Sequence, residues 1–211
     1  MQMMRVGQIA IALLLSSQVS AADKKPLSPR GTAATQVGGK WANAEDPEKR
    51  HYEGGKWIEV DYGRPLLRGR NNIFGAGPNY GKDVNAGAPV WRAGANQTTH
   101  LKTEAALEMG GKKIPAGDYA VFVELKETGW TLILSTQKTA DAYDPKDKSK
   151  IWGAYGYDPK FDVVRVPMKL STNPASVDQF TILFEDVTEK SGKLTLLWDK
   201  SVAVVPFTVA E

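Results

Sequence analysis

The stretch DYAVFVELKETGWTLILST (residues 118–136) decides the fold, because its apolar residues alternate with other residues on both sides of a short turn. Before the ETG turn, one face carries Tyr119, Val121, Val123 and Leu125. After the turn, one face carries Trp130, Leu132 and Leu134. A period of two residues is that of a half-buried β-strand. The stretch therefore predicts two antiparallel strands joined as a hairpin, with one face buried.

The same alternation recurs on both sides of this stretch. It is present in KWIEVDYG (residues 56–63) and in four later segments, residues 164–170, 180–186, 194–199 and 203–209. Turn sequences such as GGKK, PAGD, KETG and EKSGK separate the segments. This pattern of at least seven short strands predicts an all-β fold with long polar loops. We expect a single antiparallel β-sandwich, jelly-roll-like or partly closed into a barrel, since alternation does not distinguish these forms.

The first residues have the pattern of an export signal. MQMMR is short and positively charged, an apolar run follows, and Val19 and Ala21 are small residues suited to a cleavage site. We predict a signal peptide at residues 1–21, a polar N-terminal arm and loop at residues 22–55, and a β-sandwich domain at residues 56–211. The apolar run is too short for a membrane anchor. The mature protein is therefore expected in the periplasm or the medium.

Composition excludes several kinds of site. The chain has no cysteine, which excludes disulfides, thiolate nucleophiles and cysteine-based metal sites. It has only two histidines, His51 and His100, which are too few for a histidine-rich metal centre. Loss of Arg5 with the signal peptide lowers the formal net charge from +3 to +2, which is too small to predict nucleic-acid binding. No cofactor or metal is expected.

A set of short motifs is similar, in this order, to one bacterial exported family. The motifs are SPR (residues 28–30), VDYGRP (60–65), RGRNNIFG (68–75), YGK (80–82), VWRAGAN (90–96), GGKKIPAGDYAVF (110–122), WTLIL (130–134) and WGAYGYD (152–158). The chain thereby resembles the family known only as domain of unknown function 2911. The resemblance implies the fold and export, and it implies no chemistry. The segment DVNAGAP (residues 83–89) departs from the family pattern, in which YGK leads almost directly into WR.

A cluster of arginines in YGRPLLRGRNNIF (residues 62–74) is the main candidate site. Pro65 ends the preceding strand and Gly69 permits a turn, which places the arginines on a loop. A second loop (residues 90–96) carries another arginine and an amide. If the two loops meet, their guanidinium groups could hold a carboxylate or phosphate through paired hydrogen bonds. The predicted ligand-binding residues are Arg64, Arg68, Arg70, Arg92 and Asn96, with Trp91 and Tyr80 as walls.

The alternative for the same arginines is structural. They could pair with Asp61, Asp83, Asp158 or backbone carbonyls and so fix irregular loops, with their stems on aromatic rings. A calcium site at Asp141, Asp144 and Asp147 is conceivable, but the lysines between them indicate a solvated loop (residues 138–150).

Two other functional classes stay open. An enzyme of unknown class could use His100 and Asp61 as an acid–base pair, although no hydrolase motif is present. Trp130 and Trp198 are in phase with aliphatic neighbours and are predicted to lie in the core. Other aromatic residues could stack on sugars, as in a carbohydrate-binding module, or cap the ends of the sandwich: Trp57, Trp91, Trp152, Tyr155 and Tyr157.

These observations favour an exported, non-catalytic module that binds a ligand or associates with the cell envelope. Its expected ligand is an anionic small molecule, or the carboxylate of a peptide or sugar acid. A glycan is the alternative ligand, and neither nucleic acid nor a stable membrane anchor is expected. The sequence contains no pattern that indicates the oligomeric state.

Overall fold

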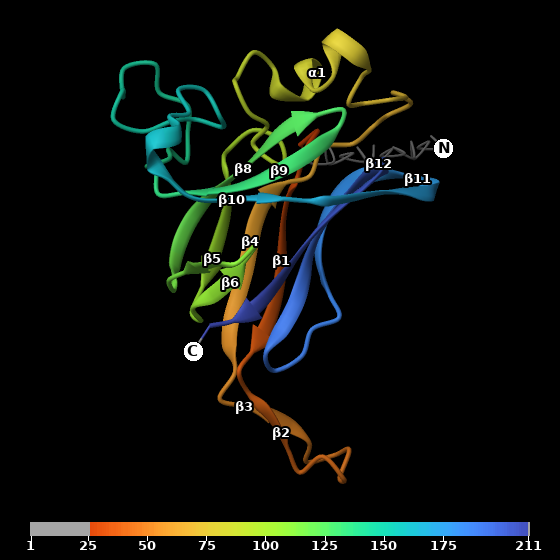
Figure 1. The fold of residues 1–211 in the computed structure, drawn as a ribbon, viewed down its shortest axis with the longest axis vertical. Coiled ribbons are helices and arrows are strands. Elements are labelled where there is room, and N and C mark those ends of the chain that lie inside the picture. The colour runs from red at the N-terminus through yellow and green to blue at the C-terminus, as the bar shows by residue number, and fades with distance from the viewer. Residues whose placement is uncertain (1–25, 211) are drawn as a thin grey trace, which may run out of the picture.

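The computed structural model describes residues 26–210, in which the alternating segments form two facing β-sheets (Figure 1). The first sheet has six strands in the order β1 (Arg30–Val37), β4 (Lys56–Gly63), β5 (Thr99–Thr103), β8 (Gly117–Lys126), β9 (Gly129–Ser135) and β10 (Asp162–Pro167). The second has four in the order β11 (Lys169–Glu185), β12 (Ser191–Val209), β6 (Leu107–Met109) and β7 (Lys112–Ile114). The predicted signal peptide, residues 1–21, lies outside the described residues.

The neighbouring strands of both sheets run antiparallel, which confirms the predicted all-β sandwich. The two sheets keep separate edge strands and do not close into a barrel. A third, two-stranded ribbon of β2 (Lys40–Ala42) and β3 (His51–Glu53) projects from one end of the sandwich (Figure 1). Helices are short: η1 (Gly77–Asn79), α1 (Lys82–Asn85) and η2 (Pro159–Phe161). Among the described residues, no helix has the length and apolar character to span a bilayer.

The hairpin predicted from residues 118–136 is present as β8 and β9. Val123 pairs with Leu132 across the hairpin, and Lys126 pairs with Gly129 at its turn. The inward side chains form the core with those of the second sheet, and Trp130 and Trp198 are each only 3% exposed, as predicted. The turn at GGKK joins β6 to β7 as a hairpin.

Strand β1 lies within the segment predicted as a polar arm. It pairs with β4 along its whole length, from Arg30 opposite Gly63 to Val37 opposite Lys56. Its inward positions carry small or polar residues except for the buried Val37 at its end, so the alternation of hydrophobicity that marks the other strands is weak here. The hydrogen bonds to β4 therefore hold β1 as a strand although it has few apolar side chains.

The outer face of the six-stranded sheet carries a second, smaller core. Ala120, Phe122 and Ile133 point outward from β8 and β9, and loop residues cover them: Ala88, Val90, Ile151 and Ala154. Because the sheet is buried on both faces at this place, these strands are apolar at successive positions. The long loops at this end of the sandwich are thus packed against the sheet and are not only connections.

Truncation of the inner core tests this architecture. Leu132 is fully buried between the sheets, so Leu132→Ala should lower the free energy of unfolding by about 2–5 kcal/mol, measured by urea denaturation. Leu27→Ala removes the same atoms from a side chain that is 64% exposed and should change stability by less than about 0.5 kcal/mol. Equal effects of the two substitutions would contradict the packing described here.

Candidate functional site

The arginine stretch joins the two sheets. Strand β4 ends at Gly63, and the chain then pairs with β11 of the opposite sheet. The amide of Phe180 donates to the carbonyl of Pro65 (2.9 Å), and the amide of Leu67 donates to the carbonyl of Asp178 (2.8 Å). The strand therefore runs out at Pro65, as the sequence predicts, and the following turn lies at the end of the sandwich opposite the β2–β3 ribbon (Figure 1).

The three arginines of this stretch point in different directions. Arg70 donates from Nε to the carbonyl of Leu67 (3.0 Å) and from Nη2 to that of Leu66 (2.7 Å). It therefore fixes its own turn through backbone carbonyls, as the structural alternative for the arginines predicts. Arg68 is exposed. The stem of Arg64 lies on Gly31 of β1, where an added Cβ would come within 2.2 Å of Cδ. The Nε of Arg64 is buried without a hydrogen-bond partner within the described residues.

Trp91 anchors the second loop in the sheet. Its amide donates to the carbonyl of Val123 (2.9 Å) and its carbonyl accepts from the amide of Val123 (2.8 Å). Strand β5 begins at Thr99, opposite Val121, so Trp91 continues the pairing of β8 beyond that point. Its ring points inward and is buried among four others: Phe74, Trp130, Phe180 and Trp198.

Strand-like alternation sends the next side chain, Arg92, away from the inner core. The residue is only 8% exposed, and its Nη1 donates to the carbonyl of Asn96 (3.0 Å). Its guanidinium carbon lies 5.1 Å from the centre of the Tyr155 ring, which is a favourable cation–π distance. Gly153 approaches so closely that an added Cβ would be 2.6 Å from Nη1. No ion pair within the described residues joins Arg92 to a carboxylate.

A cavity of about 270 Å³, which we call the arginine cavity, opens beside these groups. Four of the predicted site residues line it: Arg70, Trp91, Arg92 and Asn96. Arg64, Arg68 and Tyr80 are not among its lining residues. Tyr80 instead stacks on Phe74 and accepts a hydrogen bond from the indole of Trp130 (2.8 Å), and burial raises the pKa of its phenol.

The segment from residue 83 to 89 forms one side of the arginine cavity. Asp83, Val84 and Ala86, on and just after α1, belong to its lining. The carbonyl of Ala86 also accepts a hydrogen bond from the hydroxyl of Tyr155 (2.9 Å). The segment from residue 83 to 89 therefore shapes the cavity and holds the ring that faces Arg92.

The proposed acid–base pair lies on the outer face of the six-stranded sheet, and each member has its own partner. His100 and Asp61 are opposite each other on β5 and β4. Asp61 accepts a hydrogen bond from Thr32 (2.5 Å), while the ring nitrogens of His100 lie 2.8 Å from Asp118 and 2.8 Å from the hydroxyl of Thr139. In this arrangement His100 holds the start of a long loop against β8.

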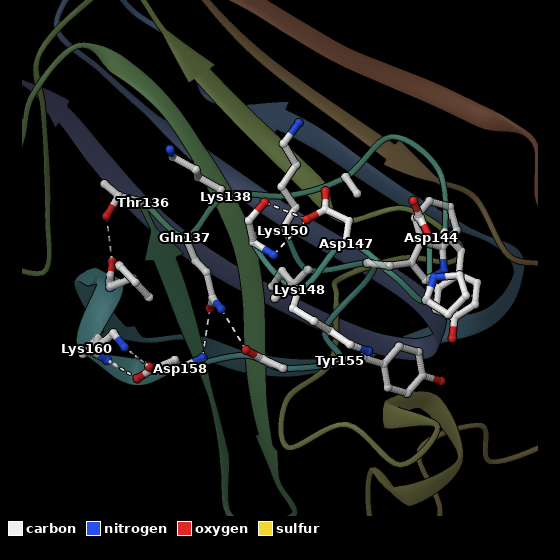
Figure 2. A pocket seen from close by; sticks show the side chains of 18 residues that line it. Thr136, Gln137, Lys138, Asp144, Asp147, Lys148, Lys150, Tyr155, Asp158 and Lys160 are labelled. Atoms are coloured by element: carbon white, nitrogen blue, oxygen red, sulfur yellow. Dashed lines mark hydrogen bonds and ion pairs between the residues drawn. The ribbon is translucent and has the colours of Figure 1, made fainter.

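That loop encloses a second and larger cavity, which we call the loop cavity (Figure 2). It measures about 770 Å³ and lies between residues 136–150 and residues 151–161. Four aromatic residues line it, Tyr143, Trp152, Tyr155 and Phe161, together with four lysines, Lys138, Lys148, Lys150 and Lys160. This cavity was not predicted from the sequence, because residues 138–150 were interpreted as a solvated loop. The available signal was the set of aromatic residues within and just after that loop.

The carboxylates of the loop cavity are engaged locally. Asp144 accepts from the amide of Lys146 (2.8 Å), and Asp147 accepts from the amide of Ser149 (2.8 Å). The hydrogen bond from the Ser149 side chain lowers the pKa of Asp147, and that from Lys160 lowers the pKa of Asp158. Within residues 26–210, no group of three or more His, Asp or Glu side chains is placed to hold a metal ion.

A family model described as protein of unknown function (DUF2911) matches residues 46–207. The chain belongs to this family. The matched region contains every lining residue of the two cavities except Ser28. No curated protein matches the chain, and no solved structure does.

Close packing of Gly153 against Arg92 gives a test of the site geometry. Gly153 has a φ of +64° and Gly54 a φ of +68°, but only Gly153 has an atom within 3 Å of an added Cβ. Gly54→Ala should therefore cost about 1 kcal/mol of stability for the backbone alone. Gly153→Ala should cost about 2–4 kcal/mol, because Arg92 must also move. Urea denaturation measures both, and equal losses would show that Arg92 is not held against Gly153.

Proposed function

We propose that this protein is an exported, non-catalytic module that binds a small carboxylate in the arginine cavity. One observation supports the proposal above the others. Arg92 is only 8% exposed as a residue, it lines a cavity, and it has no carboxylate partner within the described residues. Burial of a charge without a counter-charge is costly, so buried charges are normally paired. A bound anion would supply the missing partner.

The charge and size of the arginine cavity favour a small monoanion. Its charged lining residues are Arg70, Arg92 and Asp83, which gives a formal charge of +1. A single carboxylate balances this charge, whereas a doubly charged phosphate exceeds it. The volume of about 270 Å³ lies near the lower end for small-molecule sites, about 300–1,000 Å³. A short carboxylic acid, or the carboxylate end of a peptide or sugar acid, fits these limits.

The remaining parts of the proposal rest on other observations. Export rests on the sequence pattern of residues 1–21. Binding is favoured over catalysis because His100 already contacts Asp118 and Thr139, and it belongs to the lining of neither cavity. A group that removes or supplies a proton would have to reach the bound ligand.

Intrinsic fluorescence can test carboxylate binding, because Trp91 and Trp198 line the arginine cavity. Titration with acetate, glucuronate and phosphate should change the emission saturably with a carboxylate and less with phosphate. Arg92→Ala should weaken carboxylate binding about tenfold or more, since it removes charge-assisted hydrogen bonds. Arg92→Lys should also weaken it, because the lysine lacks the planar fork.

The matched control is Arg68→Ala, which removes an exposed guanidinium that does not line the cavity. It should leave the affinity within about twofold of the wild type. Binding that survives in Arg92→Ala, or no saturable response to any carboxylate, would refute the proposal. The thermal shift caused by ligand, rather than the melting temperature itself, is the quantity to compare, since Arg92 also supports Tyr155.

A further inference from the structure

We propose that the loop cavity is a second binding site, for an acidic oligosaccharide whose sugar rings carry carboxylates. This inference is independent of carboxylate binding in the arginine cavity. It rests on three features of the loop cavity: a fixed inner wall, exposed aromatic rings, and two lysines that have no ion-pair partner within the described residues.

The inner wall is held by hydrogen bonds from several directions. The amide of Ala140 donates to the carbonyl of Ile151 (2.8 Å), and the amide of Ile151 donates to that of Lys138 (2.9 Å). The side-chain amide of Gln137 donates to the carbonyl of Gly156 (2.8 Å) and accepts from the amide of Asp158 (2.9 Å), as Figure 2 shows. Both ends of the loop are therefore fixed, and its middle forms the outer wall.

The aromatic rings are accessible, unlike those of the inner core. Tyr143 is 66% exposed, Tyr155 is 44% exposed and Phe161 is 37% exposed. Trp152, which lies between Tyr143 and Tyr155 in the sequence, is partly exposed. An exposed ring offers an apolar face to the C–H groups of a sugar ring, and its polar edge can reach hydroxyl groups. The volume of about 770 Å³ is large enough for several sugar units.

The charges favour an acidic glycan over a neutral one. Lys160 pairs with Asp158 (2.7 Å), and Lys150 contributes to the lowered pKa of Asp147. Lys138 and Lys148 have no ion pair within the described residues. The lining as a whole carries four lysines and three aspartates, a formal charge of +1, and the aspartates accept hydrogen bonds from turn amides or pair with Lys160. Two lysines are thus available for carboxylates that repeat along a chain, and lysine acts as a point charge without the bidentate geometry of arginine.

Oligogalacturonate is a suitable probe, because methyl esterification gives a matched ligand with the same rings and no charge. Titration calorimetry should show binding of the free acid and binding weaker by about tenfold or more for the methyl ester. The affinity for the free acid should also fall as salt is added, since the lysines are exposed. Equal binding of both ligands would overturn the assignment of an acidic glycan.

Substitutions locate the site. The double substitution Lys138→Ala/Lys148→Ala should weaken oligogalacturonate binding about tenfold, and Tyr143→Ala should weaken it severalfold. Lys146→Ala is the matched control, because it removes an exposed lysine of the same loop that does not line the cavity. It should leave the affinity within about twofold of the wild type.

Two results would overturn the inference: no binding of oligogalacturonate, or binding that the double substitution leaves unchanged. Binding lost in Arg70→Ala but kept in the double substitution would assign the glycan to the arginine cavity instead. Acetate binding that fails while oligogalacturonate binds would refute only the proposed function of the arginine cavity. The two proposals can therefore fail separately.

Discussion

Two backbone hydrogen bonds between Trp91 and Val123 determine the geometry of the end of the sandwich that holds the two cavities. They extend the six-stranded sheet by one residue pair beyond the start of β5, and so impose strand-like alternation on the loop. Val90 consequently lies in the outer core and Trp91 in the inner one. Arg92 follows on the outer side, where the ring of Tyr155 faces it. A loop without this pairing would have no fixed direction for its guanidinium.

The two cavities at this end use positive charge in different ways. In the arginine cavity Arg92 is a buried residue whose guanidinium is held by a carbonyl and a ring. A charge in such a place interacts strongly with an anion, because little water screens it. In the loop cavity the lysines are exposed, so each attracts an anion weakly and salt reduces the effect. The first arrangement suits one small ligand, and the second suits several contacts along an extended one.

Tyr155 belongs to both arrangements. Its ring lies over Arg92, it lines the loop cavity, and its hydroxyl donates to the carbonyl of Ala86 in the segment from residue 83 to 89. The sequence left two roles open for the arginines, ligand binding and the fixing of loops, and the structure gives different roles to different arginines. Arg70 both pins a turn and lines the arginine cavity, whereas Arg64 and Arg68 line neither cavity. Spacing in the sequence could not separate these roles, because it does not give the direction of a side chain on an irregular loop.

The sequence by itself determined an all-β fold of antiparallel strands, because alternation of apolar residues is a local property that survives without knowledge of the partner strand. It determined the β8–β9 hairpin and the burial of Trp130 and Trp198 for the same reason. It did not reveal β1, whose small inward residues become a strand only through pairing with β4. Only the structure showed that the sheets stay separate and do not close into a barrel. Only the tertiary structure brought Arg92 to Gly153 and Tyr155, about 60 residues away in the chain. Contacts of that kind depend on how loops pack on the outer face of the sheet, and no local pattern records this packing.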